Sequence, residues 1–234
     1  MRASDTHLLG QGIYSLAEAT RLTKVSTWRI RRWLRGYRFR TGGVEHSSPA
    51  VWAPGLPELD GKLALSFLDL IDVRFVDAFL RAGVSWPTLR RSVCIARERM
   101  GSSHPFSTER FRTDGHSLFV YIQEHGEESL IELVRSQQYF KSIISPCFKD
   151  IEFVDDEPSR WWPLGRRRMV VVDPQRNFGQ PIISGTGIPT AILARAAKAS
   201  ASVEAVAQWY EIDARAVRNA VEFQDWLTTT QQAA

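Results

Sequence analysis

The stretch that decides the fold is IYSLAEATRLTKVSTWRIRRWL, residues 13–34. Its first part predicts a helix over residues 13–22, because Ser15 and Glu18 stand three residues apart in the order of a capping box. In a capping box the two side chains satisfy backbone N–H groups that the first turn of a helix leaves free. The sequence therefore predicts a helix with a defined first turn.

A second helix is expected after only three intervening residues. Ser26 is a suitable N-cap, the apolar residues up to Leu34 recur at helical spacing, and Gly36 can end the helix. Two short helices separated in this way are typical of a helix-turn-helix unit, whose second helix enters the major groove of DNA. We expect Trp28 and Trp33, one turn apart, to pack in the core of the unit.

The residues after the second helix predict a β-hairpin. Gly42 and Gly43 lie between Phe39 and Val44, as in a tight turn that joins two strands. A hairpin that follows a helix-turn-helix unit is a wing. Trp52 is expected to pack the loop that follows the hairpin back onto the body of the domain.

Charge is distributed unevenly along the chain, although the net charge is only +4. Residues 21–40 include eight Lys or Arg and no Asp or Glu, whereas residues 123–160 include nine acidic and four basic residues. The basic stretch favours a polyanion as partner. Duplex DNA is our main interpretation, and RNA or an acidic protein is the alternative. The residues expected at the DNA are Ser26, Thr27, Arg29, Arg31, Arg32, Arg35, Arg38 and Arg40.

Two longer helices are expected next. Residues 65–82 carry apolar side chains every three or four positions, and Ser85 can cap the helix that follows. Asp69, Asp72 and Asp77 belong to the first of these helices. We expect them to form its solvated face and do not interpret them as metal ligands.

The segment 104–172 is expected to be a small mixed α/β region. Asp114 and Gly115 predict the turn of a β-hairpin over residues 110–122, because Asp-Gly is a strong hairpin signal. The other elements expected here are a helix over 129–140 and strands over 150–154 and 168–173.

The C-terminal part is expected to be helical. Its glycine-rich loop GTGIP, residues 185–189, lacks the lysine of a phosphate-binding P-loop, so a nucleotide site is not expected. The helices expected after this loop cover residues 190–199, 203–210 and 214–227. The last helix carries an apolar stripe that we assign to dimerisation or a protein partner, with core packing as the alternative. Its candidate partner-binding residues are Arg215, Arg218, Phe223 and Trp226.

Two segments of the N-terminal half resemble the MerR-type winged helix-turn-helix family. The match rests on residues 13–34, quoted above, and on LIDVRFVDAFLRAGVSWPTLRRSV, residues 70–93. The resemblance implies a DNA-binding domain with a recognition helix and a wing. Lys24 departs from the family, which usually has glycine in this turn, and a left-handed lysine costs about 1 kcal/mol. No ligand-sensing cysteine pair follows, so a metal-sensing activator is not expected.

Residues 171–223 resemble the DUF433 family. The match rests on Asp173-Pro174, on Gly179 and Pro181, and on the GTGIP loop. The resemblance implies a trihelical module that is found in antitoxins encoded beside PIN-like ribonuclease toxins of the DUF5615 type. A MerR-like head joined to a DUF433 tail is similar to a VapB-type antitoxin.

Together these observations predict a mainly helical α+β chain. Its expected parts are a MerR-like winged helix-turn-helix over 1–103, a mixed α/β segment over 104–172 and a DUF433 three-helix domain over 173–234. The expected function is that of an antitoxin that binds a PIN-like ribonuclease toxin and, as a homodimer, represses its operon by binding double-stranded operator DNA. The alternative is a stand-alone MerR-like regulator whose middle segment senses a small molecule.

Catalytic and membrane functions find no support in the sequence. The histidines and the two cysteines lack metal-ligand spacing, and no nucleophile motif is present, so we expect neither an enzyme nor a cofactor nor a metal site. No apolar run reaches the length of a transmembrane helix, and no signal peptide is evident. A cytoplasmic bacterial protein is therefore expected.

Overall fold

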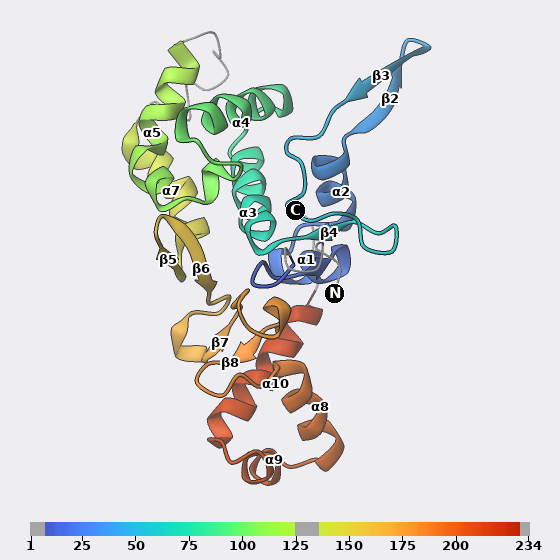
Figure 1. The fold of residues 1–234 in the computed structure, drawn as a ribbon, viewed down its shortest axis with the longest axis vertical. Coiled ribbons are helices and arrows are strands. Elements are labelled where there is room, and N and C mark those ends of the chain that lie inside the picture. The colour runs from blue at the N-terminus through green and yellow to red at the C-terminus, as the bar shows by residue number, and fades with distance from the viewer. Residues whose placement is uncertain (1–7, 125–135, 230–234) are drawn as a thin grey trace. The chain divides into compact units, whose positions relative to one another are not determined.

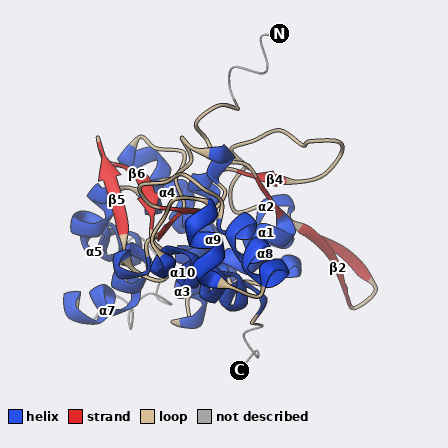
Figure 2. Cartoon of the chain, turned by 90° about the horizontal axis from the view of Figure 1, so that it is seen from below, coloured by secondary structure: helices blue, strands red, loops and turns tan. Residues whose placement is uncertain are grey.

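The chain forms two compact units, which we describe separately. The computed structural model describes residues 8–124 and 136–229. The N-terminal unit comprises the described residues within 15–149 and 153–158, and the C-terminal unit those within 1–14, 150–152 and 159–234. Helices predominate, and the described strands form two-stranded sheets (Figure 2), so the mainly helical mixed class is confirmed at this level. Within the described residues, no helix combines the length and the apolar character needed to cross a membrane.

The three-domain division predicted from the sequence stays a prediction. Residues of the expected middle segment, 104–172, contribute to both compact units. The expected helix over 129–140 falls partly outside the described residues, because the structure describes the chain again only from Ser136. Helix α7 then spans Gln137–Phe148, which extends well beyond the predicted end.

Both predicted helices form, although the first begins three residues later than the predicted range 13–22. After β1 (Tyr14–Ser15), helix α1 spans Leu16–Thr23, and helix α2 spans Thr27–Arg35. The capping box forms: the Ser15 hydroxyl accepts a hydrogen bond from the Glu18 N–H, and the Glu18 carboxylate accepts one from the Ser15 N–H at 2.9 Å. Lys24 adopts the left-handed conformation, with φ of 63°, and this residue ends α1.

The predicted hairpin follows α2 directly. Strands β2 (Tyr37–Thr41) and β3 (Val44–Ser48) are antiparallel, and Thr41 pairs with Val44. Gly42 and Gly43 form the two-residue turn, and both have positive φ. Positive φ at both positions gives the turn a twist that matches the twist of the two strands. The hairpin extends away from the helices of the N-terminal unit (Figure 1).

The core of the N-terminal unit consists of packed phenylalanine rings. Phe79 stacks on Phe119 with ring centroids 5.0 Å apart, and Phe106, Phe111 and Phe140 surround this pair. Such clusters bury large apolar areas and add favourable ring contacts. The remaining elements of the unit besides α7 are β4 (Ala64–Leu65), α3 (Phe67–Arg81), α4 (Trp86–Met100) and α5 (Glu109–Glu124).

The predicted hairpin over residues 110–122 is wrong, because α5 covers this stretch. Phe111, Leu118 and Ile122 recur at helical spacing and are all buried. Gly115 lies on the same face, and a Cβ there would come within 2.7 Å of the Phe111 ring. The burial of this face outweighs the local turn preference of Asp114-Gly115.

The acidic residues of α3 do not form a solvated face, so that prediction is also wrong. Asp69 is fully buried and accepts hydrogen bonds from the Trp52 indole N–H at 2.8 Å and from Ser66. Trp52 is thereby packed onto the domain as expected. Asp72 is buried against His104, whose Nδ1 lies 2.6 Å from a carboxylate oxygen. Burial raises the pKa of Asp72. The carboxyl groups of this helix can point into the core because each of them has a polar partner there.

The helices of the C-terminal unit also match their predictions. The hairpin of β5 (Ile151–Val154) and β6 (Glu157–Trp161) is divided between the two units, because residues 153–158 belong to the N-terminal one. A small sheet of β7 (Val170–Val171) and β8 (Ile182–Ile183) precedes the helices. The sequence did not predict β6. The helices are α8 (Thr190–Ser200), α9 (Val203–Trp209) and α10 (Ala214–Thr228).

Residues before α1 complete the C-terminal unit. The Ile13 N–H donates to the Phe178 carbonyl, and the Tyr14 hydroxyl donates to the Gly179 carbonyl, both at 2.9 Å. Gly179 has φ of +81°, and a Cβ at this position would lie 2.1 Å from the Tyr14 hydroxyl oxygen. This glycine is therefore required by both its backbone conformation and its neighbour.

Replacement of Gly179 by alanine should destabilise the C-terminal unit more than the same change at Gly185. Both residues have positive φ, but a Cβ at Gly185 has no atom within 4 Å. Each alanine costs about 1–2 kcal/mol for the left-handed backbone, and only Gly179→Ala adds the clash. We expect a difference of at least about 1 kcal/mol in urea unfolding. Equal costs would contradict the proposed role of the Tyr14 contact.

Candidate nucleic-acid interface

Helix α2 presents one exposed face. Trp28, Arg31 and Arg35 are all exposed, and their spacing of three and four residues places them on one side of the helix. Trp28 is 62% exposed, so the expectation that it packs in the core is wrong. Trp33 is buried as expected and stacks on Trp86 of α4 with ring centroids 6.3 Å apart.

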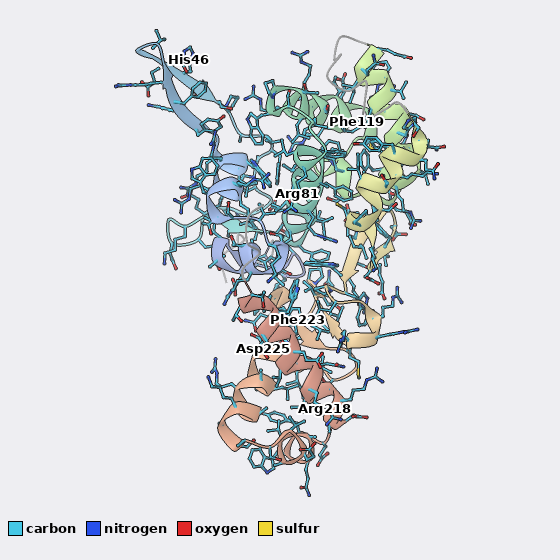
Figure 3. All side chains as sticks on the ribbon, turned by 180° about the vertical axis from the view of Figure 1, so that it is seen from behind. His46, Arg81, Phe119, Arg218, Phe223 and Asp225 are labelled. Carbon is cyan, nitrogen blue, oxygen red and sulfur yellow. The ribbon has the colours of Figure 1, made fainter. Side chains whose placement is uncertain are left out.

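Arg29 faces α3 and not the open side of α2. Its guanidinium Nη1 lies 2.7 Å from a carboxylate oxygen of Asp77. The other oxygen of Asp77 lies 2.7 Å from Nε of Arg81, which Figure 3 labels on α3. The expectation that Asp77 faces solvent is wrong, because its side chain is buried. The two guanidinium groups compensate its charge in this position.

Arg32 lies between two aromatic rings. Its guanidinium carbon lies 3.3 Å from the centroid of the Tyr37 ring and 4.1 Å from that of Trp28. These residues, with Arg29, Trp33 and Trp86, line a pocket of about 170 Å³. The pocket combines ring faces with two cations, a set of groups that also recognises planar, electron-rich partners.

The other arginines of the basic stretch differ in their partners. Arg35 forms an ion pair with Glu58, and Arg38 lies 3.8 Å from Glu45 across the hairpin. For Arg31 and Arg40, no ion pair or hydrogen bond of the guanidinium is found in the described part of the chain. These two exposed cations are available to an anionic partner.

The first residues of α2 act within the helix pair. The Ser26 hydroxyl accepts a hydrogen bond from the Arg29 N–H and caps the helix. The Thr27 hydroxyl lies 3.0 Å from that of Thr20 on α1. These contacts fix the start of α2 against α1.

The hairpin has a basic face and an aromatic face. Arg38 and Arg40 are two residues apart in β2, so their side chains lie on the same side of the sheet. Phe39 lies on the opposite side and stacks on its cross-strand partner His46, with ring centroids 5.3 Å apart. Figure 3 labels His46 on this hairpin.

The candidate partner residues of α10 divide into two groups. Arg215 and Arg218 are exposed, and Arg218 lies 3.2 Å from Glu204. Phe223 is fully buried, so its assignment to an exposed surface is wrong and the core-packing alternative holds for it. Trp226 is half-buried and stacks on Phe223 with centroids 5.4 Å apart. Figure 3 labels Arg218 and Phe223 on this helix.

Comparison with known proteins places the chain in a family. A family model described as "Protein of unknown function (DUF433)" matches residues 170–223, which confirms that resemblance. Over 222 residues the chain is 30% identical to "Putative antitoxin VapB45" of Mycobacterium tuberculosis, covering 90% of this chain and 92% of that protein. The chain belongs to the VapB-type antitoxin family.

A solved structure also resembles this member of the antitoxin family. The crystal structure of Rv2018 from Mycobacterium tuberculosis has a TM-score of 0.69 and 26% sequence identity. The similarity covers 89% of this chain and 96% of that one. The MerR-type assignment of the first two helices stays a prediction.

Removal of the Asp77 charge should loosen α2 from α3. Asp77→Asn retains the shape of the side chain but weakens hydrogen bonds to two arginines, and we expect a loss of about 1.5–3 kcal/mol of unfolding free energy. The matched control is Asp114→Asn, which disrupts an exposed pair with Arg110 and should cost less than about 0.5 kcal/mol. Urea unfolding measures both, and equal losses would contradict a special role of Asp77.

Proposed function

We propose that the chain is the antitoxin of a type II toxin–antitoxin pair. It neutralises a PIN-like ribonuclease toxin of the DUF5615 type by direct binding, and as a homodimer it represses its own operon. The observation that carries this proposal is the similarity to a protein named as an antitoxin, which extends over 92% of that relative. The chain acts by binding, without catalysis and without a cofactor.

We assign operator binding to a MerR-type winged helix-turn-helix made of α1, α2 and the β2–β3 hairpin. Helix α2 lies in the major groove, and the basic face of the hairpin crosses the phosphate backbone. The exposed guanidinium groups of Arg31 and Arg40, which have no ion-pair partner among the described residues, support this arrangement. Each contact with a phosphate releases counterions, so binding must weaken as salt rises.

The combined substitution Arg31→Ala and Arg40→Ala should weaken binding to operator DNA and flatten its salt dependence. The slope of log affinity against log salt should fall by about 0.9 for each phosphate that the variant no longer binds. The control is Arg110→Ala with Arg112→Ala, which removes the same charge from α5, where each arginine is paired with an acidic residue. If both double variants change the slope equally, binding depends on net charge and not on this surface.

Toxin binding is assigned to the exposed arginines of α10. PIN-like nucleases use clustered carboxylates, and an arginine can pair with a carboxylate through two parallel hydrogen bonds. Arg215 and Arg218 are exposed, and an exposed ion pair such as that of Arg218 with Glu204 is readily exchanged. The inhibitory surface of the C-terminal unit therefore begins at the first turns of this helix.

The toxin assignment is tested by co-expression with the product of the neighbouring gene. We expect the two proteins to co-purify, and Arg215→Ala with Arg218→Ala should reduce recovery of the toxin. The control Arg195→Ala with Lys198→Ala removes two charges from the surface of α8 and should leave recovery unchanged. A neighbouring gene that encodes no small nuclease would remove the basis of the antitoxin proposal.

A second candidate function is that of a regulator that senses a small molecule. One observation favours it: a groove of about 950 Å³ borders α5 and α7. Its apolar residues include Ile144 and Phe148, and its cations are Arg112, Lys141 and Lys149, which together suit an amphipathic anion. A thermal shift with such a ligand that also alters DNA binding would favour this function over the antitoxin role.

A further inference from the structure

The arginines of α2 are not equally free to read a base. Arg29, which the sequence places near the bases, is engaged by the buried carboxylate of Asp77. Arg35 is engaged by Glu58. A base contact by Arg29 would leave the buried carboxylate of Asp77 with one cation fewer, whereas the exposed pair of Arg35 exchanges more readily. Arg29 is therefore not expected to read a base, and the other arginines of the helix are the candidates.

Arg32 is held through its two faces. The guanidinium carbon is 3.3 Å from the Tyr37 ring centroid and 4.1 Å from the Trp28 ring centroid, so the flat faces of the group are covered by rings. In the described residues, no hydrogen bond or ion pair engages the N–H groups along its edge. A guanidinium held in this way is oriented but still has its donors available.

We propose that Arg32 determines operator specificity by a bidentate contact to a guanine, and that Trp28 positions it. This inference rests on the proposed DNA-binding function. Guanine offers two acceptors, O6 and N7, in the major groove, and their spacing matches the planar fork of arginine. Because the rings limit the conformations of Arg32 before binding, less side-chain entropy is lost in the complex.

The position of Trp28 supports this role. It precedes Arg32 by one helical turn, and the residue is 62% exposed although tryptophan is highly buried on average. An exposed tryptophan contributes little to the packing of the N-terminal unit. At this position, however, the Trp28 ring lies against the guanidinium of Arg32 on the open side of α2. Tyr37, the first residue of β2, covers the other face.

The test is the selection of binding sites from a random DNA duplex pool by the full chain and by three variants. Arg32→Lys retains the charge but lacks the fork, Trp28→Ala removes the ring, and Trp28→Phe keeps a ring. We expect Arg32→Lys and Trp28→Ala to lose preference at one G·C position by about 5- to 150-fold, the range of a bidentate pair. Trp28→Phe should retain most of that preference, and the salt slope should stay that of the wild type.

Other outcomes contradict the inference. Uniform weakening of binding with an unchanged motif would mean that Arg32 contacts a phosphate, and an unchanged motif with unchanged affinity would mean that the pair does not face the DNA. The control Trp209→Ala removes a tryptophan of similar exposure from the C-terminal unit and should leave the motif intact. If the wild-type chain itself enriches no sequence, the proposed DNA-binding function fails, and this result is distinct from a change in the variants alone.

Discussion

The ion pair between Arg29 and Asp77 determines how α2 meets the rest of the N-terminal unit. A carboxylate that is almost excluded from water needs a cation, and Asp77 receives one from α2 and another, Arg81, from its own helix. Because Arg29 is directed toward α3, the residues on the opposite side of α2 must face solvent. The pair thus sets which side chains, among them Trp28 and Arg31, are offered to a partner.

The two units place different chemistry on their surfaces. The N-terminal unit combines exposed guanidinium groups with aromatic rings on α2 and the adjoining hairpin, which suits a polyanion as partner. The C-terminal unit carries the DUF433 match, and its last helix buries Phe223 while it exposes Arg215. In an antitoxin, regulation and inhibition would accordingly belong to separate parts of one chain.

Most helices and the β2–β3 hairpin could be predicted from residues close together in the sequence. The features that could not be predicted depend on contacts with residues far along the chain. The caps Ser15, Ser26 and Ser85 act on the residues beside them, so their helices were predictable. Asp114-Gly115 failed as a turn because Phe111 and its helical neighbours are buried by residues distant in the sequence. The same limit applies to the candidate site: its basic residues were evident, but the partner of Arg29 and the exposure of Trp28 depend on tertiary packing.

The contact of Tyr14 with Gly179 has a consequence for biosynthesis. The two residues are 165 positions apart, and α1 begins immediately after β1, to which the first of them belongs. The N-terminal unit is therefore an insertion between the pieces of the C-terminal unit, whose first piece cannot pair until residues 178 and 179 have left the ribosome. During translation residues 8–14 lack their hydrogen-bond partners, so the nascent chain presents an open segment to proteases until the segment around Gly179 has been synthesised.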